Sequence, residues 1–156
     1  MPSEKIKGYL NSHGIRYVTI SHSPAYTSQE IAASAHISGK MLAKTVAVLI
    51  DGRPAMAVMP ANEKMVIEAL RQAAGAGDVE LVPEERLAEL FPGTEPGAEP
   101  PLGGLYGAEV YVSPDLGDHE EIAFNAGNFS ELIVMRYYDY ERLENPNIIE
   151  FTRVYQ

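Results

Sequence analysis

Hydrophobic and polar residues along the chain repeat with two periods, one typical of helices and one of strands. Apolar residues three or four positions apart predict helices over residues 3–13, 27–35, 63–75, 83–91 and 138–145. Alternating or continuous apolar runs predict strands over residues 16–20, 43–50, 54–60, 79–82, 108–113, 120–127 and 131–137. Because this order mixes hairpins with longer crossovers, we expect an α+β fold, with helices around a mostly antiparallel, twisted mixed sheet.

Short motifs sharpen the ends of several of these elements. Thr27 and Glu30 have the spacing of a capping box, which predicts the start of the second helix. The Asp51-Gly52 pair lies between two apolar runs and predicts a tight hairpin turn. Asn62 precedes the third helical pattern, and we expect it to cap that helix.

The length and charge of the chain limit its fold and its partners. A length of 156 residues fits one domain with a substantial core, and we expect that domain to span residues 1–156. The net charge of −10 argues against broad, nonspecific binding to nucleic acid. Residues 1–77 nevertheless hold eight Lys or Arg and five Asp or Glu. A basic segment within them could contact a phosphate, although a solvated surface explains the same pattern. Its basic residues are Lys40, Lys44, Arg53, Lys64 and Arg71.

Cysteine is absent, which removes disulfides, thiol nucleophiles and cysteine metal sites. The four histidines show no HxxxH or HxH spacing, so we expect no metal site. No run reaches the roughly 18 apolar residues of a membrane helix. The first residues, MPSEKIKGYL, lack the apolar core of a signal peptide. We therefore expect a cytoplasmic protein with no membrane partner and no DNA partner.

Lys44 opens the predicted strand over residues 43–50, whose other members are almost all apolar. A lysine at the end of a strand ordinarily lays its stem on apolar surface and keeps its amine in water. The same position could instead fix a positive charge beside a cleft, where it would hold a phosphate or stabilise an oxyanion. The pattern alone leaves both interpretations open.

Two glycine-containing segments are further candidates for a site. GAEPPLGG, residues 97–104, lies within a loop over residues 92–107 whose length is typical of functional loops. Proline stiffens such a loop, and glycine lets backbone amides approach a ligand closely. FNAGN, residues 124–128, ends a strand and could line a small pocket. Ordinary surface turns explain both segments as well, and a turn histidine such as His22 is usually a surface residue.

Together these segments resemble the YbaK and prolyl-tRNA-synthetase-associated (INS-like) editing-domain family. The resemblance covers nearly the whole chain, because HSPAYTSQEIA, AKTVAVLIDG, GAEPPLGG and FNAGN occur in the family's order. Its most specific matches are Lys44 in AKT and the GxxxP loop from Gly97 to Pro101. Leu102 departs from the family pattern, since many members carry an aromatic residue after the prolines, and this implies a different pocket shape.

The resemblance implies a freestanding trans-editing hydrolase, an aminoacyl-tRNA deacylase that cleaves the ester between a mischarged amino acid and the 3′-terminal adenosine. It also implies a strongly curved, barrel-like sheet wrapped by helices, and no metal or cofactor. Its partner would be the acceptor end of aminoacyl-tRNA, and an aminoacyl-tRNA synthetase is a further candidate partner. Lys44 would be the catalytic residue, in contact with the terminal nucleotide. The residues expected to bind substrate are His22, Tyr26, Thr27, Met41, Gly97, Pro101, Gly103, Gly104, Asn125, Gly127 and Asn128.

Simple chemistry is compatible with this function. An aminoacyl ester is already activated, so a positioned water and a stabilised oxyanion suffice for its hydrolysis. We expect backbone amides of the 97–104 loop and of Gly127 to hold the carbonyl and amino groups. The main alternative is a noncatalytic module that binds aminoacyl-tRNA ends or a synthetase. A small esterase is a third reading, but no GxSxG motif supports it. The sequence leaves open which amino acid is removed.

Overall fold

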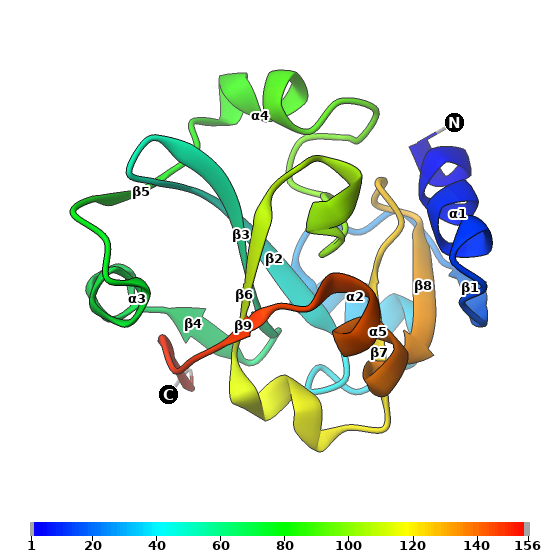
Figure 1. The fold of residues 1–156 in the computed structure, drawn as a ribbon. Helices are drawn as coiled ribbons and strands as arrows, with labels where there is room; N and C mark the ends of the chain where they lie inside the picture. The colour runs from blue at the N-terminus through cyan, green and yellow to red at the C-terminus, as the bar shows by residue number, and fades with distance from the viewer. Residues whose placement is uncertain (1, 155–156) are drawn as a thin grey trace.

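The computed structural model describes residues 2–154 and confirms the α+β class (Figure 1). Its helices are α1 (Pro2–Ser12), α2 (Ser28–Ala35), α3 (Ile67–Ala74), α4 (Glu84–Leu90) and α5 (Tyr137–Glu144), with short 3₁₀ helices η1 (Gly103–Leu105) and η2 (Pro114–Asp118). Its strands are β1 (Tyr17–Ser21), β2 (Ala43–Ile50), β3 (Arg53–Pro60), β4 (Glu63–Met65), β5 (Val79–Leu81), β6 (Glu109–Val112), β7 (Glu121–Asn125), β8 (Glu131–Arg136), β9 (Asn147–Ile148) and β10 (Thr152–Val154). Every helix and strand expected from the sequence is present, and β4, β9 and β10 are additional.

The strands form three sheets, and within the described residues they do not close into a barrel. The largest sheet has the order β5-β2-β3-β6-β9, the second β1-β8-β7 and the third β10-β4. Neighbours are antiparallel except β3 with β6 and β6 with β9, which are parallel. The mostly antiparallel, mixed character is therefore confirmed. Figure 1 shows β2, β3 and β5 on one side of the molecule and α1, β1 and β8 on the other.

The two larger sheets meet at the start of β2. The Ala123 N–H of β7 donates to the carbonyl oxygen of Met41 at 3.0 Å, and Leu42 forms an isolated parallel bridge with Ala123. The Ala61 N–H, just after β3, donates to the Leu42 carbonyl oxygen at 2.8 Å. Leu42 is buried and packs against Ile31 of α2. This junction places the beginning of β2 beside α2 and the end of β7.

Strand β2 buries side chains on both of its faces, because successive residues of a strand point in opposite directions. Ala43, Ala47 and Leu49 belong to the main hydrophobic core, while Val48 and Ile50 belong to a second one. Lys44 therefore shares its face with the second core, and Thr45 shares its face with the main core. Two neighbouring polar residues at the start of β2 are thus directed to opposite sides of the sheet.

Two local motifs form as expected from the sequence. The Thr27 Oγ1 accepts the Glu30 N–H at 3.1 Å, and a Glu30 carboxylate oxygen accepts the Thr27 N–H at 3.2 Å, which completes the capping box. Asp51 and Gly52 have positive φ angles of 50° and 81°, the backbone of the tight hairpin turn that joins β2 to β3.

The expected role of Asn62 as a helix cap is wrong. The next three residues form β4, which pairs with β10, and α3 begins only at Ile67. Glu63 explains the difference, since its side chain is only 3% exposed. The Glu63 Oε1 accepts hydrogen bonds from Ser113 Oγ at 2.8 Å and Thr152 Oγ1 at 2.5 Å. Partners 50 and 89 residues away therefore hold this segment extended.

Candidate functional site

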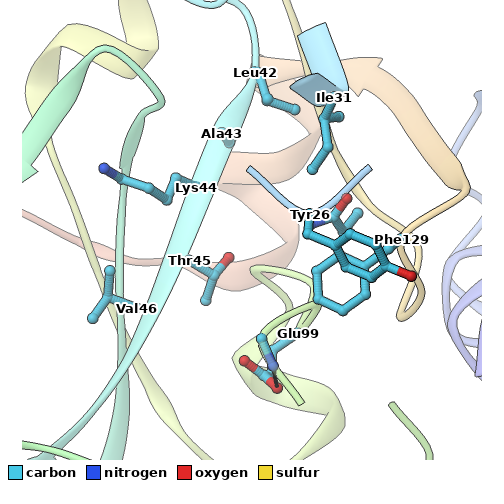
Figure 2. A pocket seen from close by; sticks show the side chains of 11 residues that line it. Tyr26, Ile31, Leu42, Ala43, Lys44, Thr45, Val46, Glu99 and Phe129 are labelled. Carbon is cyan, nitrogen blue, oxygen red and sulfur yellow. Dashed lines mark hydrogen bonds between the residues drawn. The ribbon is translucent and has the colours of Figure 1, made fainter. Parts of the chain in front are cut away.

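A cavity of about 240 Å³ opens where the two larger sheets meet (Figure 2). Its walls come from the start of β2, from α2 and the turn before it, from the 97–99 loop, and from the end of β7 with the turn that follows. The lining residues are Tyr26, Ile31, Leu42, Ala43, Lys44, Thr45, Val46, Gly97, Glu99, Asn125 and Phe129. Segments more than 100 residues apart in the sequence thus share one cavity.

Four residues expected from the sequence to form the site line this cavity, namely Tyr26, Lys44, Gly97 and Asn125. The remaining eight expected residues are not part of its lining, namely His22, Thr27, Met41, Pro101, Gly103, Gly104, Gly127 and Asn128. Most of the eight have structural contacts that account for their residue types.

The turn residues among these eight hold the backbone around the cavity. The Thr27 side chain caps α2, and the Asn128 Oδ1 accepts the Ser130 N–H at 3.0 Å. The Gly127 carbonyl oxygen accepts the Glu95 N–H at 2.8 Å, and this bond connects the loop over residues 92–107 to the turn after β7. These contacts hold in place the backbone segments whose neighbouring residues line the cavity.

His22 and Met41 lie within four residues of a lining residue along the chain. His22 has polar neighbours, and Met41 has apolar ones. The His22 Nδ1 lies 2.8 Å from the Ser23 carbonyl oxygen, while its Nε2 is buried with no hydrogen-bond partner in the described part of the chain. Met41 is partly buried and packs against the small core around α2.

The second half of the loop over residues 92–107 packs against α1 and α5, the first and last helices. The Pro101 carbonyl oxygen accepts the Tyr140 hydroxyl at 2.8 Å. The Gly104 N–H donates to Glu144 Oε1 at 2.9 Å. Gly103 has no room for a side chain, because a Cβ there would collide with the carbonyl oxygen of Ala108. This part of the loop is a packing element of the fold.

Leu102, which departs from the family pattern, does not line the cavity. Its side chain is fully buried in the main core and is absent from the cavity lining. An apolar side chain between the prolines and Gly103 gains more by joining the core than by facing the open cavity.

The side chain of Lys44 lies at the edge of the cavity. Its Nζ donates to the carbonyl oxygen of Glu63 at 2.6 Å, which directs the amine toward β4. Figure 2 shows this side chain pointing to the opposite side of β2 from Glu99 and Phe129. The positive charge of Lys44 and the carboxyl group of Glu99 therefore occupy opposite sides of one strand.

Glu99 is a site residue that the sequence interpretation missed. It lies inside the GxxxP segment, yet it is only 4% exposed and lines the cavity. The Gly97 N–H donates to its Oε2 at 2.8 Å. Burial raises the pKa of the Glu99 carboxyl group above its usual range, and the Gly97 amide offsets part of this rise. An acidic residue among prolines and small residues was the available signal in the sequence.

The first amides of the loop expected to face a ligand are already engaged. The Gly97 N–H bonds to Glu99, the Ala98 N–H donates to the Glu95 carbonyl oxygen at 2.9 Å, and prolines 100 and 101 have no N–H. The loop therefore contributes the Glu99 carboxyl group to the cavity rather than these amides.

An aromatic pair stands at the cavity. The rings of Tyr26 and Phe129 are 5.0 Å apart between centroids and tilted by 50°. Tyr26 is 70% exposed, so much of its ring is open to contact with a ligand. Phe129 is a second lining residue that the sequence did not predict, because the candidate segment FNAGN ends one residue before it.

Two further features bear on cofactors and membranes. Across residues 2–154, no group of three or more His, Asp or Glu side chains is arranged to hold a metal ion. No helix in this range combines the length and apolar character needed to cross a bilayer.

Comparison with known proteins assigns the family. The sequence pattern of the aminoacyl-tRNA editing domain family matches residues 22–143, which include all of the cavity lining. The chain belongs to this family. As an editing-domain protein it also has solved structural relatives, although no curated protein matches its sequence.

Three structures illustrate the similarity of this editing domain to solved folds. One is of a protein described as a candidate trans-editing enzyme for prolyl-tRNA synthetase, with 16% identity, a TM-score of 0.84 and 97% of each chain covered. Another is of the hypothetical protein APE2540, with 20% identity, a TM-score of 0.85, and 96% and 99% coverage. A signal-transduction candidate from Marinobacter aquaeolei VT8 has 18% identity and a TM-score of 0.76, and the match covers 96% of this chain and 30% of that one. At these identities the similarity shows the fold.

Proposed function

We propose that this editing-domain protein is an aminoacyl-tRNA deacylase that hydrolyses, in trans, the ester between a mischarged amino acid and the 3′-terminal adenosine. The observation that carries the proposal is the cavity at the junction of the two sheets, which is lined by the start of β2 with Lys44 at its edge, by the GxxxP loop and by the turn after β7. Membership of the editing-domain family supports it. Its partner is the acceptor end of aminoacyl-tRNA, and a synthetase would assist the choice of tRNA.

Lys44 is the residue to which we assign the contact with the terminal nucleotide. A hydrogen bond to the Glu63 backbone carbonyl directs its amine to the β4 side of β2. A phosphate oxygen approaching there would be an anionic acceptor for the ammonium, so Coulomb attraction would add to the hydrogen bond. The acyl group would then enter the cavity on the Thr45 side, next to Glu99 and Phe129.

The exposed ring of Tyr26 supplies a surface for the terminal base. Stacking of a base on an aromatic ring contributes about 1–3 kcal/mol per base and tolerates any sequence. The small size of the cavity, about 240 Å³, fits an aminoacyl group rather than a whole nucleotide. Recognition of only the tRNA end is compatible with the net charge of −10.

A deacylation panel tests the proposal. Several tRNAs charged with noncognate amino acids are incubated with native protein, Lys44→Ala and the control Lys64→Ala, which removes an exposed lysine from the neighbouring strand β4. Loss of a charged hydrogen bond, about 1.5–3 kcal/mol, predicts a fall in kcat/KM of about tenfold to a hundredfold for Lys44→Ala and little change for Lys64→Ala.

Two outcomes would contradict this reading. Hydrolysis of none of the esters by native protein would exclude the deacylase and leave a noncatalytic module that binds aminoacyl-tRNA ends. Equal rates for native protein and Lys44→Ala would remove Lys44 from the reaction while leaving the activity itself intact.

A further inference from the structure

Glu99 carries a buried carboxyl group for which residues 2–154 supply no cationic partner in an ion pair. It is 4% exposed, and none of the ion pairs among the described residues involves it. Its one neutral donor outside its own backbone is the Gly97 N–H, at 2.8 Å from Oε2. Buried carboxylates ordinarily have a cationic partner, because an unpaired buried charge is costly. The cavity in front of Glu99 is therefore suited to a ligand that brings a positive charge.

Asn125 offers a second, independent acceptor in the same cavity. Its Oδ1 is buried and has no hydrogen-bond partner among residues 2–154. Buried polar side-chain atoms almost always have such a partner, so an unpaired one that lines a cavity indicates that a ligand supplies the donor. Asn125 ends β7 and Glu99 lies in the GxxxP loop, so two separate segments present acceptors to one space.

The acceptors define what kind of group fits there. A primary ammonium has three N–H donors, one positive charge and no acceptor, which suits a carboxylate together with an amide oxygen. Apolar side chains of Ile31, Leu42 and Phe129 form another part of the cavity wall. A ligand that joins an ammonium to a hydrocarbon side chain on one carbon atom would match both parts of the wall.

We infer that Glu99 and Asn125 form the subsite for the α-ammonium group of the aminoacyl ester, with Glu99 as its anionic ligand. This inference rests on the proposed function, because the aminoacyl ester is the substrate of that reaction. The α-ammonium is the one cation common to all aminoacyl esters, whatever their side chain. The subsite therefore fixes the α-carbon and leaves side-chain selection to the apolar wall.

The competing role for Glu99 is that of a base that activates water. The two roles predict different dependence on the substrate's amino group. A base would act equally on an ester whose α-ammonium is replaced by a hydroxyl group, whereas an ammonium ligand would lose its partner in that ester.

The experiment compares one tRNA carrying either an aminoacyl group or the matching α-hydroxyacyl group. Native protein, Glu99→Gln and the control Glu85→Gln, an exposed acid on α4, are assayed for kcat/KM on both esters. For Glu99→Gln we expect a loss of about tenfold to a hundredfold on the aminoacyl ester and less than about threefold on the hydroxyacyl ester. Glu85→Gln should match native protein on both. Asn125→Leu should change the same ratio in the same direction.

The outcomes separate this inference from the proposed function. An equal loss on both esters, or no loss on either, would overturn the ammonium subsite while the deacylase stands. A binding titration with the stable amides 3′-aminoacylamino- and 3′-hydroxyacylamino-3′-deoxyadenosine covers the case of no hydrolysis. Tighter binding of the aminoacyl compound by native protein, lost in Glu99→Gln, would support the subsite even in an inactive protein. Equal binding of both compounds by native protein would overturn it.

Discussion

Replacing Gly103 with alanine tests whether this glycine packs the loop or contacts substrate. A Cβ at Gly103 would collide with the Ala108 carbonyl oxygen and would lie 2.5 Å from Val110 Cγ2. The Gly103 carbonyl oxygen also accepts the Ala108 N–H at 2.9 Å, so the backbone on both sides of the collision is already fixed. The added methyl group can be accommodated only if η1 moves away from β6.

The size of the effect follows from this geometry. Overpacking a buried position typically costs about 1–3 kcal/mol, and a backbone collision partner places Gly103→Ala in the upper part of that range, about 2–3 kcal/mol. For a chain of this length, each kcal/mol lowers Tm by about 2–4 °C. We therefore expect Tm to fall by about 4–12 °C.

Thermal and urea unfolding of Gly103→Ala and Gly8→Ala provide the assay. Gly8 lies on the exposed side of α1, and a Cβ there would meet no atom within 4 Å. The identical chemical change should therefore stabilise the protein at Gly8, by about 0.5–1 kcal/mol. If Gly103→Ala kept native stability but lost deacylation, the packing argument would be refuted and Gly103 would belong to the substrate site.

Three other predictions follow from named contacts. Tyr140→Phe leaves the Pro101 carbonyl oxygen without its donor and should cost about 1–3 kcal/mol in urea unfolding, more than Tyr137→Phe, whose hydroxyl bonds the partly exposed Glu141 at 3.1 Å. Burial raises the pKa of Glu99, so this group binds its proton more tightly in the native protein than in the unfolded chain, and its contribution to stability should fall as pH rises from its ordinary pKa of about 4 to its native pKa. Tm measured from pH 4 to 8 should fall less steeply for Glu99→Gln, and identical slopes would contradict this. In tRNA binding, Lys44→Ala should reduce the slope of log K against log salt by about 0.7, the value for one single-strand phosphate. Glu99→Gln should leave that slope unchanged, and an unchanged slope in Lys44→Ala would exclude the phosphate contact.

Local signals in the sequence were sufficient where the partners are close in the chain. The capping box joins residues three positions apart, and the hairpin turn needs only two adjacent residues that accept positive φ. The periodicity of apolar residues located the helices and longer strands for the same reason. Such features depend on the backbone within one or two turns, which the sequence states directly.

Strand β4 could not be predicted because its cause lies elsewhere in the chain. Glu63 reads as an exposed residue at the start of a helix, and Asn62 before it is a good capping residue. In the fold, hydroxyl groups of Ser113 and Thr152 bond the buried Glu63 carboxylate. A helix starting at Asn62 would lose the pairing of β4 with β10, so tertiary contacts override the local preference.

The candidate site shows the same division between local and distant information. Four residues expected from the sequence line the cavity. They could be predicted because each belongs to a segment with a recognisable motif. Glycines 103 and 104 belong to the same loop motif, but they lie outside the cavity. Their lack of a side chain is explained by close packing of Gly103 against the start of β6 and of Gly104 against α1. Glu99 escaped notice because burial of a loop carboxyl group depends on how the loop folds back on the turn after β7. The Glu95 contacts to Gly127 and Phe129 that produce this fold join residues more than 30 positions apart.

Under the proposed function, the arrangement across β2 gives a physical reason for the adjacent polar residues Lys44 and Thr45 at the start of this strand. An aminoacyl-tRNA end carries opposite charges on its two sides, an ammonium on the acyl group and phosphates on the nucleotide. Alternation along a strand separates neighbouring side chains onto opposite faces without any extra element. Lys44 is thereby kept on the β4 face while Glu99 closes the other face. Had both groups shared one face, Glu99 could pair with Lys44, and the proposed ammonium subsite would lose its unpaired carboxyl group.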